Sequence, residues 1–251
     1  MPTTVKEIYH CIDTIAPFER AMDFDNCGIL AGDANAQVQT ALVALDITKD
    51  VVEEAVQKKA QLIISHHPVI FQPLRSLPFD SPVGLLAQNH IAAICAHTNL
   101  DLSPCGVNVC LAQALGLTNQ KLIDGECMVT GALVQPLAAY AFAMHVKTAL
   151  SCAGVRFTAI QKQVKTVAVS GGAGGDGLYK ALQLGADAFV TGEIKHHQLL
   201  DAASCGLCIV DAGHFKTENV VIHPLTDFLS KQFPDTAFFV SERCTDHIAY
   251  L

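Results

Sequence analysis

The chain has 251 residues, of which 51% are hydrophobic and 16% charged, and this length supports one large domain or two modest lobes. Its formal net charge of −8, without any run of Lys or Arg, argues against a protein that holds nucleic acid through phosphate contacts. Because so apolar a protein is expected to cover part of its surface with other subunits, we expect an oligomer.

The first half of the chain alternates helices and strands. Thr4 and Glu7 have the spacing of a helix capping box, which predicts that the first helix begins there. The N-terminus lacks the basic and apolar regions of a signal peptide, so we expect a cytoplasmic protein. Residues 17–32 have few periodic signals, and residues 25–28 within them are typical of a turn or loop. The elements predicted next are a strand at 40–45, a helix at 49–59, a strand at 62–65, a helix at 82–89, a strand at 91–96 and a helix at 107–115.

The second half continues this alternation, which predicts α/β layers with largely parallel sheets. We place the seam within residues 116–127, which gives a first lobe of 1–125 and a second of 126–251, with the part from about 212 a candidate to pack back on the first lobe. The predicted elements are a helix at 137–152, strands at 155–160 and 164–170, a helix at 177–184, a strand at 188–191, a helix at 195–203, a strand at 207–210, a helix at 216–233 interrupted near Pro224, and a strand at 236–241.

Residues 127–146 carry no formal charge over 20 residues, a length that is able to cross a bilayer. The stretch contains Gly131, Pro136 and His145, which do not suit a membrane helix. We predict a strand that ends at Val134, followed by a helix that Pro136 starts.

The 10 cysteines are irregularly spaced, and many lie in apolar runs, as Cys95 does. This is typical of reduced, buried thiols in a cytosolic protein. Cys205 and Cys208 have the spacing of a redox pair or of half a zinc site. We favour a structural role for both, because no second Cys-x-x-Cys is present and Cys208 falls in a strand-like stretch.

The adjacent histidines His66 and His67 are the most informative feature. They follow an apolar run at 62–65 that is typical of a strand buried on both faces, and such strands present functional groups at their C-terminal ends. Both rings can serve one site only if the backbone leaves the sheet after Ser65, which Pro68 favours. Two surface histidines are the alternative for this dipeptide taken alone.

Four further groups belong with this pair. His97 and Asp101 follow the predicted strand at 91–96, while His214 and Glu218 follow the strand at 207–210. If a helix begins at about His214, then His214 and Glu218 are one turn apart on the same face, which is the spacing of a two-ligand metal site.

Imidazoles and carboxylates without thiolates suit zinc, manganese, iron, cobalt or nickel. These groups exceed what one tetrahedral ion requires, and two ions with a bridging carboxylate account for the surplus. Two cations about 3.5–4 Å apart would acidify a bridging water to a hydroxide nucleophile. The alternative is that His97 or His214 caps a helix and that the acids are solvated.

Weaker signals lie nearby. The glycine-rich run at 170–175 follows a strand and precedes a helix, as a phosphate-binding loop does, but it lacks the Lys-Ser/Thr of a P-loop and a tight turn is the alternative. Glu193 follows the strand at 188–191 and is a candidate to orient a ligand or transfer a proton. His196 and His197 lie in a predicted helix, where neighbours diverge, so at most one reaches a cleft.

Five segments, in this order, carry a family resemblance. Over essentially its full length the chain resembles the NGG-one-interacting-factor-three-like family, also catalogued as GTP cyclohydrolase 1 type 2 homologues, and it looks like a short bacterial-type member. Phe24 stands where that family usually has Trp, which we read as a packing substitution. The segments are residues 25–28, 65–68, 97–101, 191–193 and 213–218.

The resemblance implies two similar α/β lobes, a dinuclear metal site in the cleft between them, and a toroidal homohexamer built as a trimer of dimers. Its cofactors would be two divalent metal ions per chain. Glu218 would bridge them, and His97 and Glu193 would lie close by as catalytic or substrate-facing groups. The implied metal ligands are His66, His67, Asp101, His214 and Glu218.

The leading hypothesis is a metal-dependent hydrolase in which a metal-bridging hydroxide attacks a small, nucleotide-like substrate. Ring opening as in a GTP cyclohydrolase, phosphoester hydrolysis and amide hydrolysis are all compatible with such a site. The alternative is a non-catalytic metal-binding or regulatory hexamer that acts through protein partners. A ring that threads DNA is disfavoured by the acidic charge, and no membrane partner is expected.

Overall fold

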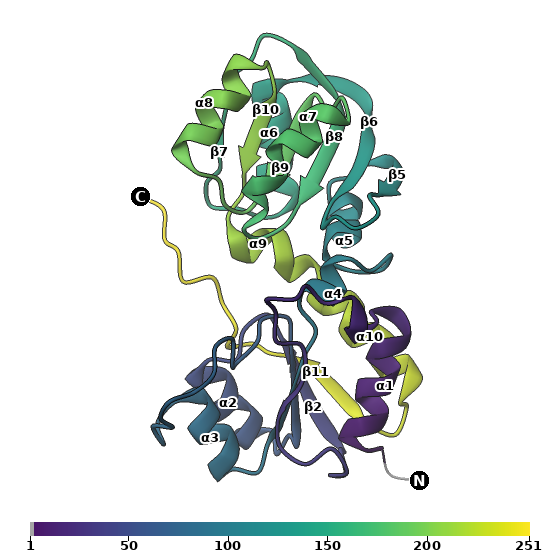
Figure 1. The fold of residues 1–251 in the computed structure, drawn as a ribbon, viewed down its shortest axis with the longest axis vertical. Coiled ribbons are helices and arrows are strands. Elements are labelled where there is room, and N and C mark those ends of the chain that lie inside the picture. The colour runs from purple at the N-terminus through teal and green to yellow at the C-terminus, as the bar shows by residue number, and fades with distance from the viewer. Residues whose placement is uncertain (1–2) are drawn as a thin grey trace. The chain divides into compact units, whose positions relative to one another are not determined.

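The computed structural model describes residues 3–251, which divide into two compact units (Figure 1). The first unit runs to Ser103 and resumes with Ile222–Thr245. The second comprises Pro104–Val221 and Asp246–Leu251. Each unit is built around one sheet, so each is an α/β body with its own core.

The sheet of the first unit has five strands, in the order β1 (Gly28–Ala31), β4 (Ala92–Cys95), β3 (Leu62–Ser65), β2 (Thr40–Ala44) and β11 (Ala237–Val240). All pairs are parallel except the edge pair of β1 with β4. The helices of this unit are α1 (Val5–Ile15), η1 (Phe18–Arg20), α2 (Lys49–Gln57), α3 (Pro82–Gln88), α4 (Thr98–Asp101) and α10 (Ile222–Gln232). Figure 1 shows α2 and α3 on one face of the sheet and α1 and α10 on the other.

Local sequence explains where these elements begin. Thr4, Thr48 and Ser81 each accept a backbone N–H at the start of a helix, and Thr4 with Glu7 completes the predicted capping box. β3 is buried along its whole length, because helices cover both faces of the sheet. The strand predicted at 62–65 is therefore confirmed to the residue.

The sheet of the second unit has six strands, in the order β5 (Thr118–Leu122), β6 (Val129–Ala138), β8 (Gln163–Ser170), β9 (Ala188–Thr191), β10 (Cys208–Asp211) and β7 (Arg156–Phe157). The helices of this unit are α5 (Val107–Ala114), α6 (Ala139–Ala149), η2 (Gly174–Gly177), α7 (Leu178–Gln183), α8 (His196–Ser204), α9 (His214–Glu218) and η3 (Asn219–Val221).

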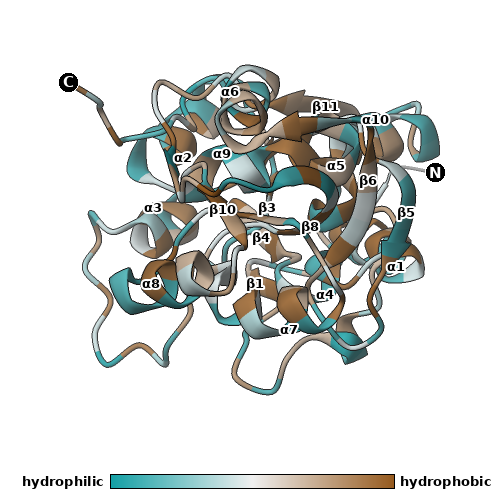
Figure 2. Cartoon of the chain, turned by 90° about the horizontal axis from the view of Figure 1, so that it is seen from above, coloured by the Kyte–Doolittle hydropathy of each residue, from teal (hydrophilic) through white to brown (hydrophobic). Residues whose placement is uncertain are grey.

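Successive residues of the central strands enter two different cores. Val167 and Val169 pack in the cluster that includes α5 and α6, whereas Ala168 packs in the cluster that includes α7 and α8. In the next strand, Val190 packs in the first of these clusters and Phe189 in the second. This is the side-chain alternation of a strand, and it explains why helices cover both faces. The hydropathy colours of Figure 2 agree, with apolar strands such as β10 and hydrophilic residues on the outer helices.

The predicted strand direction is right for the first sheet and wrong for half of the second. β8, β9 and β10 are parallel, but β5, β6 and β7 are antiparallel to their neighbours. For β5 and β6 the reason is the length of the connection, since only a few residues join these two strands and a crossover between parallel strands requires a dozen or more. The second sheet is therefore mixed.

Two strands lie where the sequence suggested none. β1 falls inside residues 17–32, and β5 falls inside the seam expected at 116–127. Because β5 pairs with β6, this segment belongs to the second sheet, and the first stretch of the first unit ends at Ser103 rather than near residue 125. Four of the five β5 residues are exposed, which removes the apolar pattern that identifies a strand.

The uncharged residues 127–146 divide between β6 and α6, but Pro136 does not start the helix. It lies in β6, where the register with β8 shifts between Ala132 and Leu137, and proline is tolerated at such an irregularity because no ladder hydrogen bond is needed there. The long final helix is broken at Asn219–Val221 rather than at Pro224. No helix among residues 3–251 combines the length and apolarity that a membrane crossing requires.

A buried carboxylate, Glu54 of α2, holds the segment that follows β11. Its oxygens accept hydrogen bonds from Ser241 Oγ at 2.5 Å, Glu242 N at 3.1 Å and Arg243 N at 3.2 Å. Burial raises the pKa of Glu54, but these hydrogen bonds and Lys58 outweigh it, so the pKa lies below its ordinary value.

We predict that Glu54→Gln lowers the free energy of unfolding at pH 7 by about 1.5–3 kcal/mol, because hydrogen bonds to a charged group are lost. The folded-state pKa is depressed, so this stabilisation is present above the ordinary pKa of 4.5 and is lost as the pH falls through the folded-state value. Urea unfolding at several pH values measures both effects, with the exposed Glu53→Gln as control. An equal deficit at every pH would contradict the assignment.

Candidate metal centre

The two adjacent histidines lie directly beyond β3. His66 N and His67 N still donate to Ala44 O and Leu45 O of the neighbouring chain segment, at 3.3 and 2.9 Å. The two rings nevertheless lie close together, with centroids 5.0 Å apart. The Ser65 hydroxyl donates to His67 O at 2.7 Å and helps to set this turn. The two rings are therefore close enough to serve one site, as the sequence analysis required.

The tautomer of His66 follows from its hydrogen bond. Its Nδ1 lies 2.9 Å from Ala96 O, and because a carbonyl oxygen can only accept, Nδ1 carries the proton. The neutral ring then has its lone pair on Nε2, which is 3.7 Å from Asp101 Oδ1. Asp101 is reached through the short helix α4, one turn after His97. His66 and Asp101 are thus brought together as the sequence suggested.

His67 and His97 are held in the same way by carboxylates. His67 Nδ1 lies 2.7 Å from Asp46 Oδ1, and His97 Nδ1 lies 2.9 Å from Asp25 Oδ1. A carboxylate that accepts from Nδ1 fixes the ring, places the lone pair on Nε2 and makes that nitrogen more basic. Both histidines are therefore prepared to bind a cation through Nε2.

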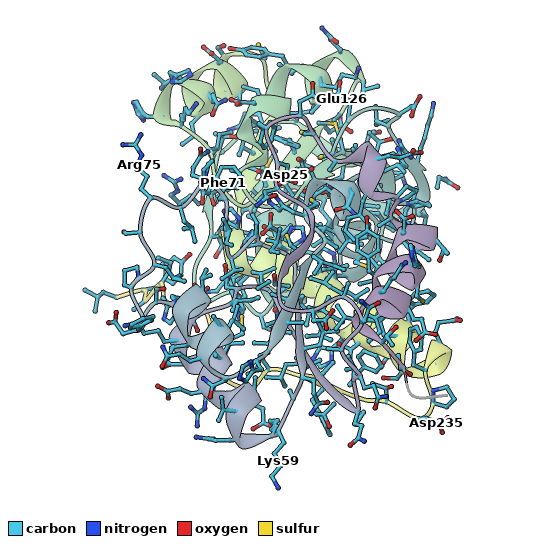
Figure 3. All side chains as sticks on the ribbon, turned by 60° about the horizontal axis from the view of Figure 1, so that its bottom comes forward. Asp25, Lys59, Phe71, Arg75, Glu126 and Asp235 are labelled. Atoms are coloured by element: carbon cyan, nitrogen blue, oxygen red, sulfur yellow. The ribbon has the colours of Figure 1, made fainter. Side chains whose placement is uncertain are left out.

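Asp25, labelled in Figure 3, has a wholly buried side chain. Besides His97 it accepts hydrogen bonds from Thr98 N at 3.0 Å, Thr98 Oγ1 at 2.6 Å and Cys27 Sγ at 3.0 Å. Burial raises the pKa of this carboxyl, but the hydrogen bonds, first among them that of the His97 ring, outweigh it and hold the pKa well below its usual range. Asp25 is therefore a fixed negative charge behind His97.

His66, His67 and His97 form a group that is suitable for a metal ion. One ligand nitrogen from each ring lies within 4.8 Å of the others. The centroid of the His97 ring is 5.0 Å from that of His66 and 5.4 Å from that of His67. Three imidazoles with assigned lone pairs and an acidic neighbour in Asp101 match the donor set that divalent transition metals prefer.

In the second unit, His214 and Glu218 occupy the two ends of α9. The helix begins at His214, as the spacing required, after Gly213 at a φ of 84°. His214 Nε2 lies 3.0 Å from Glu218 Oε2, and Glu218 is almost completely buried. The predicted pairing on one helix face is present.

Glu193 orients His214 from behind. Its Oε1 lies 2.7 Å from His214 Nδ1, so Nδ1 donates to Glu193 while Nε2 faces the carboxylate of Glu218. A neutral ring cannot donate to both carboxylates, because it has one N–H. Either an imidazolium or a cation next to Nε2 resolves this arrangement, and the latter is what a metal site would supply.

The glycine run lies directly against these ligands. A Cβ on Gly172, whose φ is 57°, would stand 1.9 Å from Glu218 Oε1. Gly171 N donates to Asn108 Oδ1 at 2.8 Å, and Gly172 N donates to Thr217 Oγ1 at 3.0 Å. The first two amides of the run are therefore used within the protein, and Gly172 makes the close turn against α9 that the sequence offered as the alternative.

The remaining candidates belong to neither of these two groups of side chains. His196 and His197 are both exposed on α8. Cys205 is exposed, Cys208 is buried, and both are free thiols.

Sequence reasoning missed the carboxylates that hold the rings. Asp46 follows the strand at 40–45, so the rule that identified the other residues, a polar group directly after a buried strand, would have found it. Asp25 lies in an irregular segment and reaches His97 across 72 positions of sequence, which no spacing rule reveals.

Comparison with known proteins finds relatives that match nearly the whole chain. The profile of the family described as Duf34/NIF3 (NGG1p interacting factor 3) matches residues 3–247. The GTP cyclohydrolase 1 type 2 homolog of Clostridium acetobutylicum is 30% identical over 263 residues, which cover 98% of each chain. The homolog of Streptococcus pneumoniae serotype 4 is 30% identical over 247 residues, or 93% of each chain.

Two solved structures share the fold. Staphylococcus aureus protein SA1388 has a TM-score of 0.95 and 30% identity, with 100% of both chains covered. A Bacillus cereus protein related to NIF3 has a TM-score of 0.93 and 25% identity, with 100% of this chain and 99% of that chain covered. The profile match, the curated relatives and the shared fold agree, and the chain belongs to the Duf34/NIF3 family.

Proposed function

We propose that the protein is a metal-dependent hydrolase that holds two divalent ions per chain and acts on a small, nucleotide-like molecule. The proposed ligands are His66, His67 and Asp101 of the first unit and His214 and Glu218 of the second. The observation that carries the proposal is that the Nδ1 atoms of His66, His67 and His214 all point at oxygen acceptors, which leaves Nε2 as the ligand nitrogen of each. The His97 ring is held in the same way and is proposed to face the substrate.

Divalent ions at such residues would supply a hydroxide nucleophile at neutral pH and would polarise the oxygen of a substrate. The chain's own groups would do the rest. Asp25 and Asp46 hold the His97 and His67 rings in place, so these rings need no reorganisation during a reaction. Glu193, whose side chain is 59% exposed, is within reach of solvent and is proposed to move protons to or from a substrate.

The family's curated relatives are named as homologues of a GTP cyclohydrolase, which supports a nucleotide-like substrate for this chain. Cyclohydrolase-type ring opening, phosphoester hydrolysis and amide hydrolysis all use a water-derived nucleophile and a polarised oxygen. The second candidate is a non-catalytic metal-binding or regulatory assembly. The same anchored imidazoles support it, and it differs only in lacking turnover.

The wild-type protein, purified without chelator, is expected to contain about two divalent ions per chain, as a two-metal hydrolytic site requires. His66→Ala and Glu218→Ala are expected to lose metal and hydrolysis while they keep the fold. Elemental analysis and far-ultraviolet circular dichroism measure this, with the exposed His196→Ala as control.

Three outcomes separate the candidates. Wild-type protein that contains no metal and takes up none would contradict both. Metal without hydrolysis of GTP, phosphoesters or amides would favour the non-catalytic assembly. Full hydrolysis by a metal-free variant would show that the reaction does not need the metal, which would contradict a metal-dependent hydrolase.

Gly172→Ala tests the contact between the glycine run and Glu218. The added methyl group would overlap Glu218 Oε1, so the variant is expected to lose metal with the fold retained. Gly185→Ala is the matched control, because Gly185 also has a positive φ, 72°, but has open space around it. Both variants should lose about 1–2 kcal/mol of stability from left-handed backbone strain. Metal loss confined to Gly172→Ala, measured by elemental analysis, is the expected result, and equal metal content in both would contradict it.

We further propose a homohexamer in which an exposed apolar loop of the first unit is covered by another copy. Phe71, Leu74, Leu77 and Phe79 are 45%, 52%, 44% and 76% exposed, more than a single chain in water is expected to leave uncovered on one loop. Arg75 of the same loop projects outward in Figure 3.

Light scattering of the wild type is expected to give the mass of six chains. Phe79→Ser is expected to give smaller species with unchanged circular dichroism, because it removes the most exposed apolar side chain of the loop. Tyr140→Ser, at a 66% exposed position of the second unit, serves as control. A monomeric wild type would exclude the assembly.

A further inference from the structure

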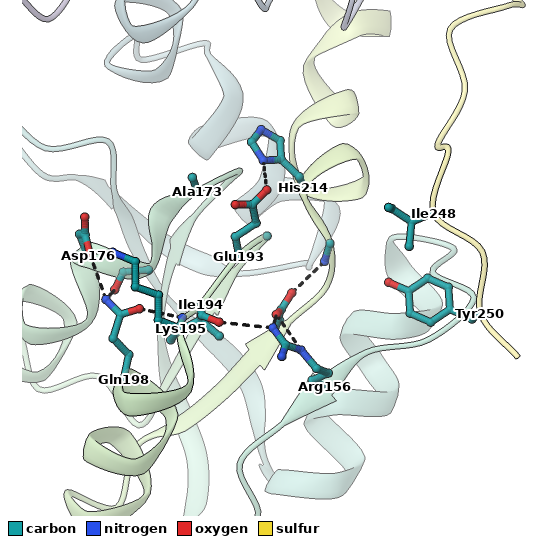
Figure 4. A pocket seen from close by; sticks show the side chains of 14 residues that line it. Arg156, Ala173, Asp176, Glu193, Ile194, Lys195, Gln198, His214, Ile248 and Tyr250 are labelled. Carbon is teal, nitrogen blue, oxygen red and sulfur yellow. Dashed lines mark hydrogen bonds and ion pairs between the residues drawn. The ribbon is translucent and has the colours of Figure 1, made fainter. Parts of the chain in front are cut away.

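The second unit contains a pocket of about 560 Å³ that opens beside His214. In Figure 4 the Glu193–His214 pair lies above Arg156, and Ile248 and Tyr250 of the C-terminal segment stand to the right. Pockets of this size accept small molecules, and their few polar groups determine which. Besides Glu193 and His214, this pocket is lined by Arg156, Lys195 and Tyr250.

Arg156 is held so that one edge of its guanidinium remains available. Its Nε donates to Asp211 Oδ2 at 3.0 Å, and its Nη2 contacts the same oxygen and Ile194 O. Asp211 is nearly buried and also accepts from Gly213 N at 3.2 Å, so it is fixed itself. Nη1 makes no hydrogen bond within residues 3–251. A guanidinium oriented in this way can still bind an anion through its second edge.

A second positive feature lines the same pocket. Lys195 precedes the nine-residue helix α8, and no side chain caps the N–H groups of its first turn. Gln198 Oε1 instead accepts from Lys195 N at 2.9 Å, and the lysine ammonium is unable to accept. The Lys195 ammonium is 3.9 Å from Asp176 Oδ1, which is a loose ion pair, and 69% of the Lys195 side chain is exposed. Lys195 and Gln198 both line the pocket, so a cation and the positive end of the α8 dipole lie at its wall.

The carboxylates of the pocket are already engaged. Asp211 binds Arg156, Glu193 accepts from His214, and Asp176 accepts from Gln198 Nε2 at 3.1 Å. Each acid thus has a donor of its own. This leaves the second edge of the Arg156 guanidinium and the Lys195 ammonium as the groups of the pocket that are available to an anion.

Tyr250 supplies an aromatic wall. A Cβ on Gly154 would lie 2.7 Å from Tyr250 Cδ1, so the ring rests directly on that glycine. Its hydroxyl lies 3.6 Å from where a Cβ of Gly213 would stand. The residue remains 47% exposed, which leaves part of the ring open to a ligand. Exposed aromatic faces in polar pockets are suited to stacking on flat ring systems.

We propose that this pocket binds the substrate as a flat heteroaromatic ring against Tyr250 with an anionic group on Arg156, as in a nucleoside monophosphate. The inference rests on the proposed hydrolytic function, because His214 lines the same pocket and would bring the bound molecule beside the metal ligands. Tyr250 and Arg156 would act in binding and positioning, not in the chemical step.

Isothermal titration calorimetry with GMP, guanosine and inorganic phosphate tests this on the full chain after chelator treatment, so that metal ions do not contribute. GMP is expected to bind at least about tenfold more tightly than guanosine or phosphate, since a charge-assisted hydrogen bond contributes about a factor of ten or more. Arg156→Gln is expected to remove this advantage and leave guanosine binding unchanged.

Tyr250→Ala is expected to weaken GMP and guanosine alike, by about tenfold from lost stacking, and Tyr250→Phe should bind like wild type. Matched controls lie in the same unit. Lys162→Gln removes an equally exposed cation paired with Asp187, and Tyr179→Ala removes an exposed tyrosine outside the pocket. Neither is expected to change GMP binding.

Absence of GMP binding to wild type, or unchanged binding in both Arg156→Gln and Tyr250→Ala, would overturn the inference. Thermal unfolding and metal content of each variant identify any loss of fold. Metal content and hydrolysis are measured separately. If the wild type holds metal and hydrolyses substrates, but Arg156→Gln does not change GMP binding, the proposed function stands and only the assignment of this pocket is contradicted.

Discussion

The hydrogen bond from a histidine Nδ1 to an oxygen acceptor is the interaction on which the candidate site depends. Ala96 O, Asp46, Asp25 and Glu193 each accept one, and each thereby decides which nitrogen of its partner carries the lone pair. Without these bonds the rings would rotate and exchange tautomers. With these bonds, the rings are already ordered in the folded protein, so metal binding does not have to restrict their rotation.

The acceptors come from places that the fold makes rigid. Ala96 stands directly after β4, and Asp46 stands two residues after β2, where parallel neighbours fix the backbone. Asp25 is fixed by several donors at once, including backbone and hydroxyl groups of Thr98. A buried, fully hydrogen-bonded carboxylate stays ionised and stays in place, which is the condition for orienting an imidazole.

The sequence predicted the elements that have a clear periodic pattern and the ligands that follow them. The strand before His66 and the helix start at His214 are recognisable because burial on both faces and i, i+4 spacing leave a local signature. β1 and β5 were missed because edge strands bury little, and Pro136 misled because a register shift accommodates it. The partnership of Asp25 with His97 depends on tertiary packing, so no local pattern contains it.

The order of the two units along the chain has a consequence for synthesis. All strands of the second sheet lie between Thr118 and Asp211, so that unit can complete its sheet as soon as those residues have emerged from the ribosome. The first sheet must wait for β11, which pairs with β2 across nearly 200 positions. Until then β2 is an unprotected apolar edge, and a stalled or truncated chain would expose it to aggregation and to proteolytic quality control.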